Sequence, residues 1–236
     1  MHLALLGMGR LARTLAPLLE GAGHRVTPWR RGDPQPQAQV CLITVSDDAV
    51  ADLAAWLEPG PVVLHTSGGL DHRVLRPHRP AGSLHPLQTF PGPELNSPPL
   101  QGVPAAVAGD PRAIQVATTL AEDLGMRPFL VPGDRRLYHA ACVLAGNFPT
   151  VLLAEAARLL ASAGISEQDD PISLLLPLVR TSIQNAGEHG PEAAITGPAA
   201  RGDQATIQAH LDALAATHPE LLPLYAALTD RARSRG

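Results

Sequence analysis

The stretch HLALLGMGRLA, residues 2–12, determines the architecture of the amino-terminal half of this chain. Its apolar run predicts a buried strand that ends at Gly7, and leucines at helical spacing after Gly9 predict a helix directly behind it. Gly7, Gly9 and Ala12 form G-x-G-x-x-A, a dinucleotide-binding fingerprint. Gly7 permits a tight turn, Gly9 lets the backbone approach a pyrophosphate, and Ala12 lets helix and strand pack closely. The helix N-terminus then offers free N–H groups to phosphates.

The residues after the next expected strand, about 24–29, bear on which cofactor this turn would take. In dinucleotide-binding domains an acidic residue about 20 positions after the fingerprint holds the ribose 2′-OH of NAD. This chain instead has Arg30 and Arg31, and two guanidinium groups suit a 2′-phosphate. We therefore expect NADP as the cofactor. A solvated basic loop is the alternative, and the nearby Asp33 keeps NAD open.

Two further strands are expected at 40–45 and 61–65; the first is apolar, Ser46 follows it, and Thr66-Ser67-Gly68-Gly69 follows the second. In an open α/β sheet, ligands bind outside the carboxyl ends of the strands. We therefore expect these ends to share the cofactor with the glycine turn. The expected cofactor-binding residues are Gly7, Met8, Gly9, Arg10, Leu11, Arg30, Arg31, Val45, Ser46, Thr66 and Ser67.

Strands and helices alternate over the first 131 residues, whereas only helical patterns follow Asp134. The alternation predicts an α/β fold with a Rossmann-type, mostly parallel sheet covered on both faces. We therefore predict a dinucleotide-binding domain over residues 1–132 and an all-helical substrate and dimerisation domain over residues 133–236.

The first helix of the second domain, expected over about residues 135–163, is apolar on all its faces. Its length would allow it to cross a membrane. His139, Asn147 and Pro149, and a composition rich in alanine, favour a soluble helix buried on all sides. So small a domain cannot bury it alone, so we expect a homodimer and no membrane partner.

Composition narrows the chemistry further. The net charge is −4, so the chain lacks the excess of basic residues that is typical of nucleic-acid-binding proteins. The 18 basic residues are all arginine, so a lysine Schiff base or lysine general acid is excluded. Two cysteines and the lack of a charged segment before the first apolar run favour a cytoplasmic protein. The histidines show no metal-ligand spacing, so we expect no metal site.

Several motifs together resemble a known family. Gly7-Met8-Gly9-Arg10, His65-Thr66-Ser67-Gly68, residues 83–90, Tyr138-His139, Asn147, residues 196–198 and Arg201-Gly202-Asp203 occur in that family's order. It comprises bacterial Rossmann-like proteins with a carboxyl-terminal domain of unassigned function, described as NADP-dependent oxidoreductases. Their layout is similar to that of pyrroline-5-carboxylate reductase, prephenate dehydrogenase and 6-phosphogluconate dehydrogenase. The resemblance implies a Rossmann domain, a helical domain of the 6-phosphogluconate dehydrogenase type, and a dimer.

His85 is the first candidate to move a proton. It follows the short expected strand 81–84, in a loop fixed by Pro86, and resembles the His-Pro pair of prephenate dehydrogenases, where the histidine acts on the substrate hydroxyl. The alternative is a histidine that only holds the loop. His139 and Asn147 are the second candidates, eight residues apart on one expected helix. They border a cleft between the domains, or else bond to neighbouring residues or to a second subunit.

Arg201 is the candidate substrate clamp, because a guanidinium fork fits a carboxylate. It could instead bind Asp203 or a partner chain. The sequence therefore predicts an NADP(H)-dependent oxidoreductase that transfers hydride to or from a small, carboxylated substrate in the cleft between its domains. The alternative is a non-catalytic NADP-binding sensor or scaffold. An enzyme requires His85 and His139 to converge, whereas a sensor does not.

Overall fold

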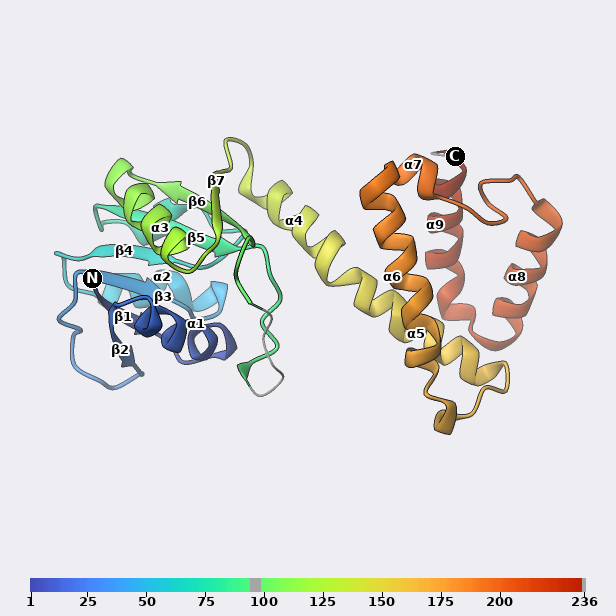
Figure 1. Ribbon diagram of the computed structural model, residues 1–236, viewed down its shortest axis with the longest axis horizontal. Coiled ribbons are helices and arrows are strands. Elements are labelled where there is room, and N and C mark those ends of the chain that lie inside the picture. The colour runs from blue at the N-terminus through green and yellow to red at the C-terminus, as the bar shows by residue number, and fades with distance from the viewer. Residues whose placement is uncertain (94–98, 235–236) are drawn as a thin grey trace. The chain divides into compact units, whose positions relative to one another are not determined.

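A computed structural model describes residues 1–93 and 99–234, which divide into two compact units, Met1–Asn147 and Phe148–Gly236 (Figure 1). The first unit contains a sheet with its helices, and the second contains helices. Residues 94–98 of the proline-rich loop expected at 91–99 lie outside the described residues. The compact units divide after Asn147, and the domain boundary expected after residue 132 stays a prediction.

The first unit is built on a seven-stranded sheet in the order β2-β1-β3-β4-β5-β6-β7. All neighbouring strands run parallel except β5 and β6, which run antiparallel. This confirms the mostly parallel, Rossmann-type sheet that the sequence predicts. The strands are β1 (His2–Leu6), β2 (Arg25–Trp29), β3 (Val40–Ile43), β4 (Val62–His65), β5 (Ala81–Pro86), β6 (Pro104–Gly109) and β7 (Arg127–Leu130).

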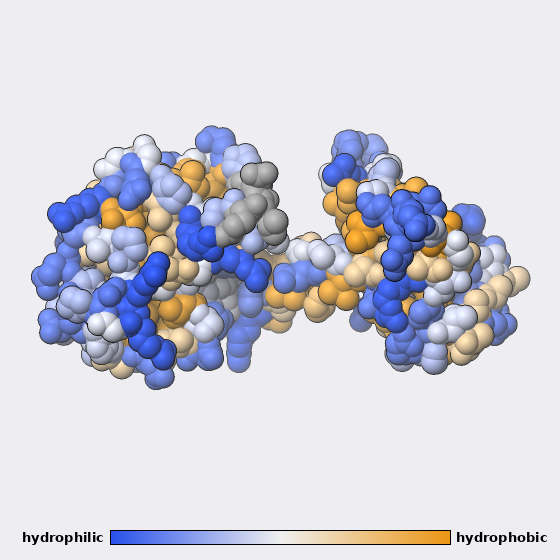
Figure 2. All heavy atoms as spheres, turned by 90° about the horizontal axis from the view of Figure 1, so that it is seen from below, coloured by the Kyte–Doolittle hydropathy of each residue, from blue (hydrophilic) through white to orange (hydrophobic). Residues whose placement is uncertain are grey.

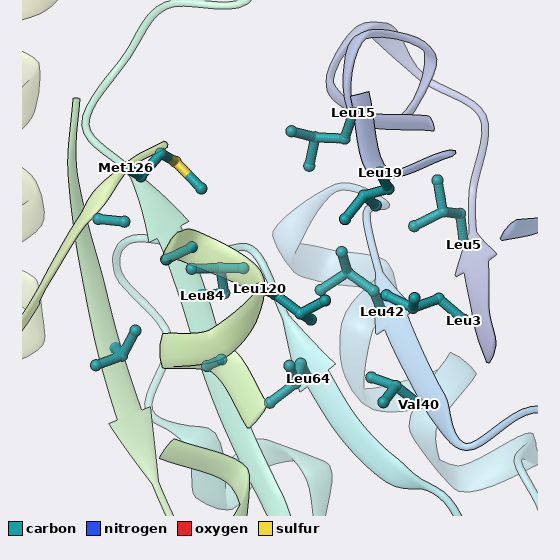
Figure 3. Close-up of a cluster of buried hydrophobic side chains, with 14 of the residues drawn as sticks. Leu3, Leu5, Leu15, Leu19, Val40, Leu42, Leu64, Leu84, Leu120 and Met126 are labelled. Atoms are coloured by element: carbon teal, nitrogen blue, oxygen red, sulfur yellow. The ribbon is translucent and has the colours of Figure 1, made fainter. Parts of the chain in front are cut away.

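Helices cover both faces of this sheet (Figure 1). Helices α1 (Arg10–Gly21) and α3 (Pro111–Asp123) pack on one face, while α2 (Asp47–Trp56) and the short helix η1 (His72–Leu75) pack on the other. In Figure 3, Leu15 and Leu19 of α1 lie among strand leucines such as Leu42 and Leu64. Burial of these side chains is the main force that holds the helices to the sheet.

The strand order changes direction at β1, because the chain adds β2 on one side of it and then β3 on the other. The helices that follow β1 and β3 therefore leave the sheet on opposite faces and open a crevice between them. Gly7 and Thr44 begin the two connections at this point. This crevice is where the fold can accept a ligand.

The remaining elements are helical. Helix α4 (Arg135–Gly146) belongs to the first compact unit. Asp203 is an N-cap, as the sequence predicts, and its carboxylate accepts a hydrogen bond from the N–H of Thr206 at 3.1 Å. The second unit contains α5 (Phe148–Ser162), η3 (Glu167–Asp169), α6 (Pro171–His189), α7 (Pro191–Ala194), α8 (Gln204–Thr217), η4 (Pro219–Leu221) and α9 (Leu222–Arg233).

The expected helix over 135–163 forms as two helices, α4 and α5, with Asn147 between them. Pro149 explains the interruption, because it has no N–H to donate to the carbonyl group four residues earlier. Within this chain the helix is not buried on all sides, and the expected cover by a second subunit stays a prediction. Arg135 is the only buried residue of α4, and α5 has none.

Together, Arg135–Ser162 is long and apolar enough to cross a membrane by length and composition alone, and none of the apolar window is buried. Exposed apolar side chains also occur on α6 and are visible on the helical part of the chain in Figure 2. The most exposed apolar side chains of α4 are Leu137 and Leu144, and those of α6 are Leu174, Leu178 and Ile183. The helical elements thus leave a large apolar surface uncovered by this chain.

Candidate functional site

The glycine turn has the geometry that a phosphate-binding turn requires. Gly7 has φ +103°, and a Cβ added to it would lie 2.6 Å from Cγ1 of Val45. Only glycine fits this position, both because of the backbone angle and because of the close neighbour. The Thr44 hydroxyl donates to the Gly7 carbonyl at 2.8 Å and fixes the turn. Gly9 is the N-cap of α1, whose first turn has no acidic side chain.

Beside this turn lies a pocket of about 590 Å³, here named the arginine pocket. Five of the expected cofactor-binding residues line it: Gly7, Met8, Arg30, Arg31 and Val45. The remaining lining residues are Trp29, Gly32, Asp33, Ala49, Asp52, Leu53 and Trp56.

Two features of the arginine pocket bear on its ligand. The Asp33 carboxylate accepts a hydrogen bond from the N–H of Arg30 at 2.7 Å, so one of its oxygens is used by the turn itself. Trp29 and Trp56 are close neighbours, with ring centroids 4.8 Å apart, and Trp56 is partly exposed. The pocket therefore combines two guanidinium groups with an aromatic wall, a combination that suits a phosphorylated nucleoside.

A second pocket of about 440 Å³, the central pocket, lies at the ends of β3, β4 and β5. It contains most of the other expected cofactor-binding residues, together with both candidate catalytic histidines. Its lining residues are Arg10, Leu11, Thr44, Val45, Ser46, Asp47, Thr66, Ser67, Gly68, His85, Phe90 and His139.

Hydrogen bonds fix the segment that follows β4 in the central pocket. The Ser67 hydroxyl donates to the Asp47 carboxylate at 2.7 Å and accepts from the N–H groups of Gly69 and Leu70. Asp47 stands in the first turn of α2, where the helix dipole favours a negative charge. These bonds place Gly68 directly against the two histidines.

His85 and His139 converge at Gly68. Their ring centroids are 6.0 Å apart and the rings are nearly perpendicular, at 88°. A Cβ added to Gly68 would lie 2.7 Å from Cδ2 of His139 and 2.8 Å from Nε2 of His85. The absence of a side chain at Gly68 therefore allows both imidazoles to approach the end of β4.

His85 is held in a neutral form by its surroundings. Its Nδ1 is hydrogen-bonded to the Tyr138 hydroxyl at 2.8 Å. Burial, followed by the nearby positive charges of Arg135 and His139, lowers the pKa of His85 to about 4. A neutral imidazole can accept a proton from a ligand through one ring nitrogen while the other stays bonded.

A third pocket of about 320 Å³, the histidine pocket, continues from these rings along α4. His139, Cys142, Val143 and Gly146 form one face of the helix, since they stand at positions i, i+3, i+4 and i+7. Asn147 borders the same pocket, so the structure brings all three predicted catalytic residues to one place. The other lining residues are His85, Pro86, Leu87, Gln88, Thr89 and Ala145.

Arg135 is a site residue that the sequence reading missed. It is 8% exposed, and one guanidinium nitrogen donates to the Ser67 carbonyl at 3.0 Å. Its guanidinium carbon lies 5.3 Å from the centre of the Tyr138 ring, within reach of a cation–π contact. The helical spacing of Arg135, Tyr138 and Cys142 is the signal that could have grouped these residues.

His65 is fully buried at the end of β4. Burial, and then the charge of Arg135, lowers its pKa to about 3. Neither ring nitrogen has a hydrogen-bond partner among the described residues, and the hydroxyl of its neighbour Ser83 has none either. Such groups cost stability and concentrate at functional sites.

Arg201 is a predicted site residue that lies outside the first unit. It lies in the second compact unit, between α7 and α8, and it is exposed. The structure therefore does not test the expected clamp. Within residues 1–93 and 99–234, no three His, Cys, Asp or Glu side chains form a group that could hold a metal ion.

Comparison with protein families gives one match. The model of the domain of unknown function DUF2520 matches residues 103–232, which is more than half of the chain. The matched region begins just before β6 and includes every helix from α3 to α9. It therefore contains His139 and Asn147 but not the glycine turn.

Curated relatives match about half of this chain. A glycerol-3-phosphate dehydrogenase [NAD(P)+] from Gloeobacter violaceus is 32% identical over 149 residues, which cover 56% of this chain and 48% of that protein. An enzyme of the same name from a Synechococcus strain is 32% identical over 139 residues, covering 51% of this chain and 44% of its own. The chain spans about half the length of the curated relatives it matches.

Solved structures match nearly the whole chain. A provisionally assigned NADP oxidoreductase from Bacteroides fragilis has a TM-score of 0.83 and 24% identity, with 99% of this chain and 98% of that one covered. A pyrroline-5-carboxylate reductase from Streptococcus pyogenes has a TM-score of 0.62 and 15% identity, covering 99% and 98%. An imine reductase from Streptomyces aurantiacus has a TM-score of 0.64 and 15% identity, covering 99% and 96%. These likenesses establish the fold.

Proposed function

The chain belongs to the DUF2520 family, and we propose that it is an oxidoreductase that uses NADP(H) to transfer hydride to or from a small substrate. The convergence of His85 and His139 at Gly68 carries this proposal. Both rings border the same central pocket as Arg10 at the start of α1, so proton-transfer groups lie beside the phosphate-binding turn. A protein that only senses a cofactor has no need of this arrangement.

The residues of the crevice fit a dinucleotide. The turn at Gly7 has no room for a Cβ. Helix α1 begins directly after this turn, and the free N–H groups at its N-terminus can bind a phosphate. Arg30 and Arg31 in the arginine pocket would bind a 2′-phosphate, which distinguishes NADP from NAD. When bound, the nicotinamide ring supplies the hydride chemistry. The protein supplies the proton and the grip on the substrate.

His85 is our candidate for the proton. With its low pKa it is neutral near pH 7, so it can accept the hydroxyl proton of a substrate as that substrate is oxidised. In the opposite direction the same imidazole returns the proton to the reduced oxygen or nitrogen. His139 would complete this pair, and the Asn147 amide would hold a polar group of the substrate in the histidine pocket. A carboxylated substrate, with Arg201 as its clamp, stays a prediction.

We also propose that the helical part forms a homodimer. On α6, Leu174 is 54% exposed, Leu178 is 65% exposed and Ile183 is 62% exposed. Contiguous apolar surface of this kind marks an interaction site in soluble proteins. A second copy of the same chain would cover it with an equally apolar surface, as a twofold interface does.

Cofactor binding is the first experiment. The chain has two tryptophans, and both border the arginine pocket, so their fluorescence reports on a ligand there. NADPH should quench this fluorescence at lower concentration than NADH. In a variant with Arg30→Asp and Arg31→Ser the preference should shrink, whereas Arg112→Ser on α3 should leave it unchanged. Equal affinity for the two cofactors in the native protein would remove the assignment to NADP.

Turnover is the second experiment. Keto acids, imines and cyclic hydroxy acids would be screened with NADPH or NADP⁺ for a change in absorbance. The His85→Asn variant should bind NADPH normally and lose most of its turnover, since removal of a general acid–base group costs about 10²–10⁴-fold. An unchanged rate in that variant would remove His85 from the mechanism. Cofactor binding with no turnover of any compound in the screen would favour the sensor.

A further inference from the structure

Arg135 is buried in a way that folding alone does not explain. Its side chain is enclosed, and two of its guanidinium nitrogens, Nε and Nη1, have no hydrogen-bond partner among the described residues. The next residue, Arg136, is exposed and forms a bidentate pair with Asp134. A buried charge without a carboxylate partner is costly. Arg136 shows that the start of α4 can carry an arginine without that cost.

The contacts of Arg135 connect the end of β4 to His85 in three steps. The guanidinium donates to the Ser67 carbonyl at 3.0 Å, which anchors it to the segment after β4. It lies 5.3 Å from the centre of the Tyr138 ring. The Tyr138 hydroxyl is in turn 2.8 Å from Nδ1 of His85. Side-chain contacts therefore link Arg135 to Tyr138 and Tyr138 to His85, and the Ser67 carbonyl anchors Arg135 at the end of β4.

We propose that Arg135 is a positioning residue, which holds the Tyr138 ring so that its hydroxyl oxygen accepts from Nδ1–H of His85 and Nε2 is left free of hydrogen. Nε2 is the nitrogen that faces Gly68. The tautomer decides whether His85 presents a hydrogen-bond donor or acceptor to a substrate, and only this consequence rests on the proposed function. The placement of the three side chains is independent of it.

The surroundings of Tyr138 and His85 agree with this arrangement. Burial, followed by a hydrogen bond with Cys142, raises the pKa of Tyr138 well above its usual value, so the phenol keeps its proton for Cys142 and its oxygen can accept from His85. The titratable and charged groups around His85 are Arg135, Tyr138 and His139 from α4 and His65 from β4. None of these four is a carboxylate. Arg135 therefore also disfavours the imidazolium form of His85.

The experiment measures the tautomer and pKa of His85 by NMR of the ring nitrogens in the full-length protein, with His85→Asn to assign the signals. In the native protein the neutral ring should carry its hydrogen on Nδ1. In Arg135→Met the Nδ1–H form should lose its dominance, and the pKa should rise by about one unit because a nearby like charge is gone. Tyr138→Phe should cause the same loss of the preferred tautomer.

Arg136→Met is the matched control, since it removes a neighbouring arginine that is exposed. It should change neither the tautomer nor the pKa. Arg135→Lys keeps the charge without the flat guanidinium, so the pKa should stay low while the tautomer preference falls. This variant also decides the matter if Arg135→Met does not fold.

An unchanged tautomer in folded Arg135→Met or Arg135→Lys would overturn the proposal, and so would an equal effect of Arg136→Met. NADPH quenching measured on the same samples keeps the two proposals apart. Failure of the native protein to bind NADPH would defeat the proposed function and leave the result on His85 standing.

Discussion

The two compact units bury their side chains to very different extents. In the first unit, leucines of β1, β3, β4 and β5 are almost completely enclosed between two layers of helices. In the second unit, the described residues include only three buried side chains, Ile207, Leu214 and Thr229. The first unit therefore has its own hydrophobic core, whereas the second has exposed apolar side chains on most of its helices.

This difference indicates where each unit obtains its stability. Apolar burial is the largest favourable contribution to folding, and the first unit achieves it within one chain. The helices of the second unit must gain it from another surface, because helices in water depend on the packing of an apolar face. Association of two copies would supply that surface. The two units therefore differ in whether their apolar side chains are buried within one chain or require a second surface, and this difference can be tested.

The largest expected effect comes from a charge on the exposed face of α6. Leu178→Glu should convert a dimer to monomers, measured by light scattering, because a buried carboxylate without a partner is very costly at an interface. Leu130→Glu is the matched control, since Leu130 is 60% exposed at the end of β7 in the first unit and Leu178 is 65% exposed. The control should keep the native mass. If the native protein is already a monomer, the contrast between the units needs another explanation.

The next effect concerns acid stability in the first unit. The pKa of His65 is lowered to about 3 in the folded protein, so unfolding takes up a proton below the ordinary histidine pKa of 6.5. Stability is therefore complete above about pH 6.5 and is lost as the pH falls toward 3, at about 1.4 kcal/mol per pH unit for this one group. Denaturant titrations at pH 7 and pH 5 should show the loss.

In His65→Leu the difference between the two pH values should shrink. Stability at pH 7 should change little, because neither ring nitrogen of His65 has a partner to lose among the described residues. His210→Leu in the second unit is the comparison, as that histidine is exposed and bonded to Tyr225. An undiminished pH dependence in His65→Leu would mean that other groups cause the loss of stability at low pH.

The sequence predicted those parts of the first unit that depend on local pattern. The glycine turn, the strand before it and the helix after it follow from the spacing of Gly7, Gly9 and the apolar residues. The sequence also identified the convergence of His85 and His139 as the feature that an enzyme requires, and the two rings do come together. It placed His85 after a strand and His139 on a helix that borders the cleft.

The sequence did not predict what depends on three-dimensional neighbours. Trp56 reaches the arginine pocket only because α2 ends beside Trp29. Arg135 has no sequence signal of its own, because its enclosure results from the path of the segment after β4. This chain leaves the two helices over 135–163 largely exposed, because an apolar composition indicates that a helix is covered but not which surface covers it, and cover by a second subunit stays a prediction.

A smaller effect compares a crowded glycine with an open one. Gly68→Ala should lower the free energy of unfolding by about 1–3 kcal/mol, since its Cβ would meet both imidazoles at under 3 Å. Gly187→Ala, near the end of α6, has no atom within 4 Å of the added Cβ and should instead raise stability by about 0.5–1 kcal/mol. Thermal unfolding would measure both. A Gly68→Ala variant that is as stable as the native protein would show that the site is not tightly packed.

The smallest effect concerns the aromatic wall of the arginine pocket. Trp56 is 41% exposed and lies against Trp29, so one face of it is available for stacking. An adenine ring stacked on it would gain about 0.5–1.5 kcal/mol, which corresponds to roughly a threefold to tenfold change in affinity. Trp56→Ala should weaken the binding of NADPH by this factor, with Trp29 left as the fluorescent reporter.

A control exists in the second unit, where Tyr225 and His210 line an apolar pocket of about 410 Å³. Tyr225→Phe should leave the affinity for NADPH unchanged, because this pocket has no guanidinium group and no glycine turn. Nicotinamide mononucleotide, which lacks the adenosine, should bind the native protein and Trp56→Ala equally. If its binding weakens as much as that of NADPH, Trp56 acts on the fold of the pocket and not on the base, and the first unit then depends on this side chain for its structure as well.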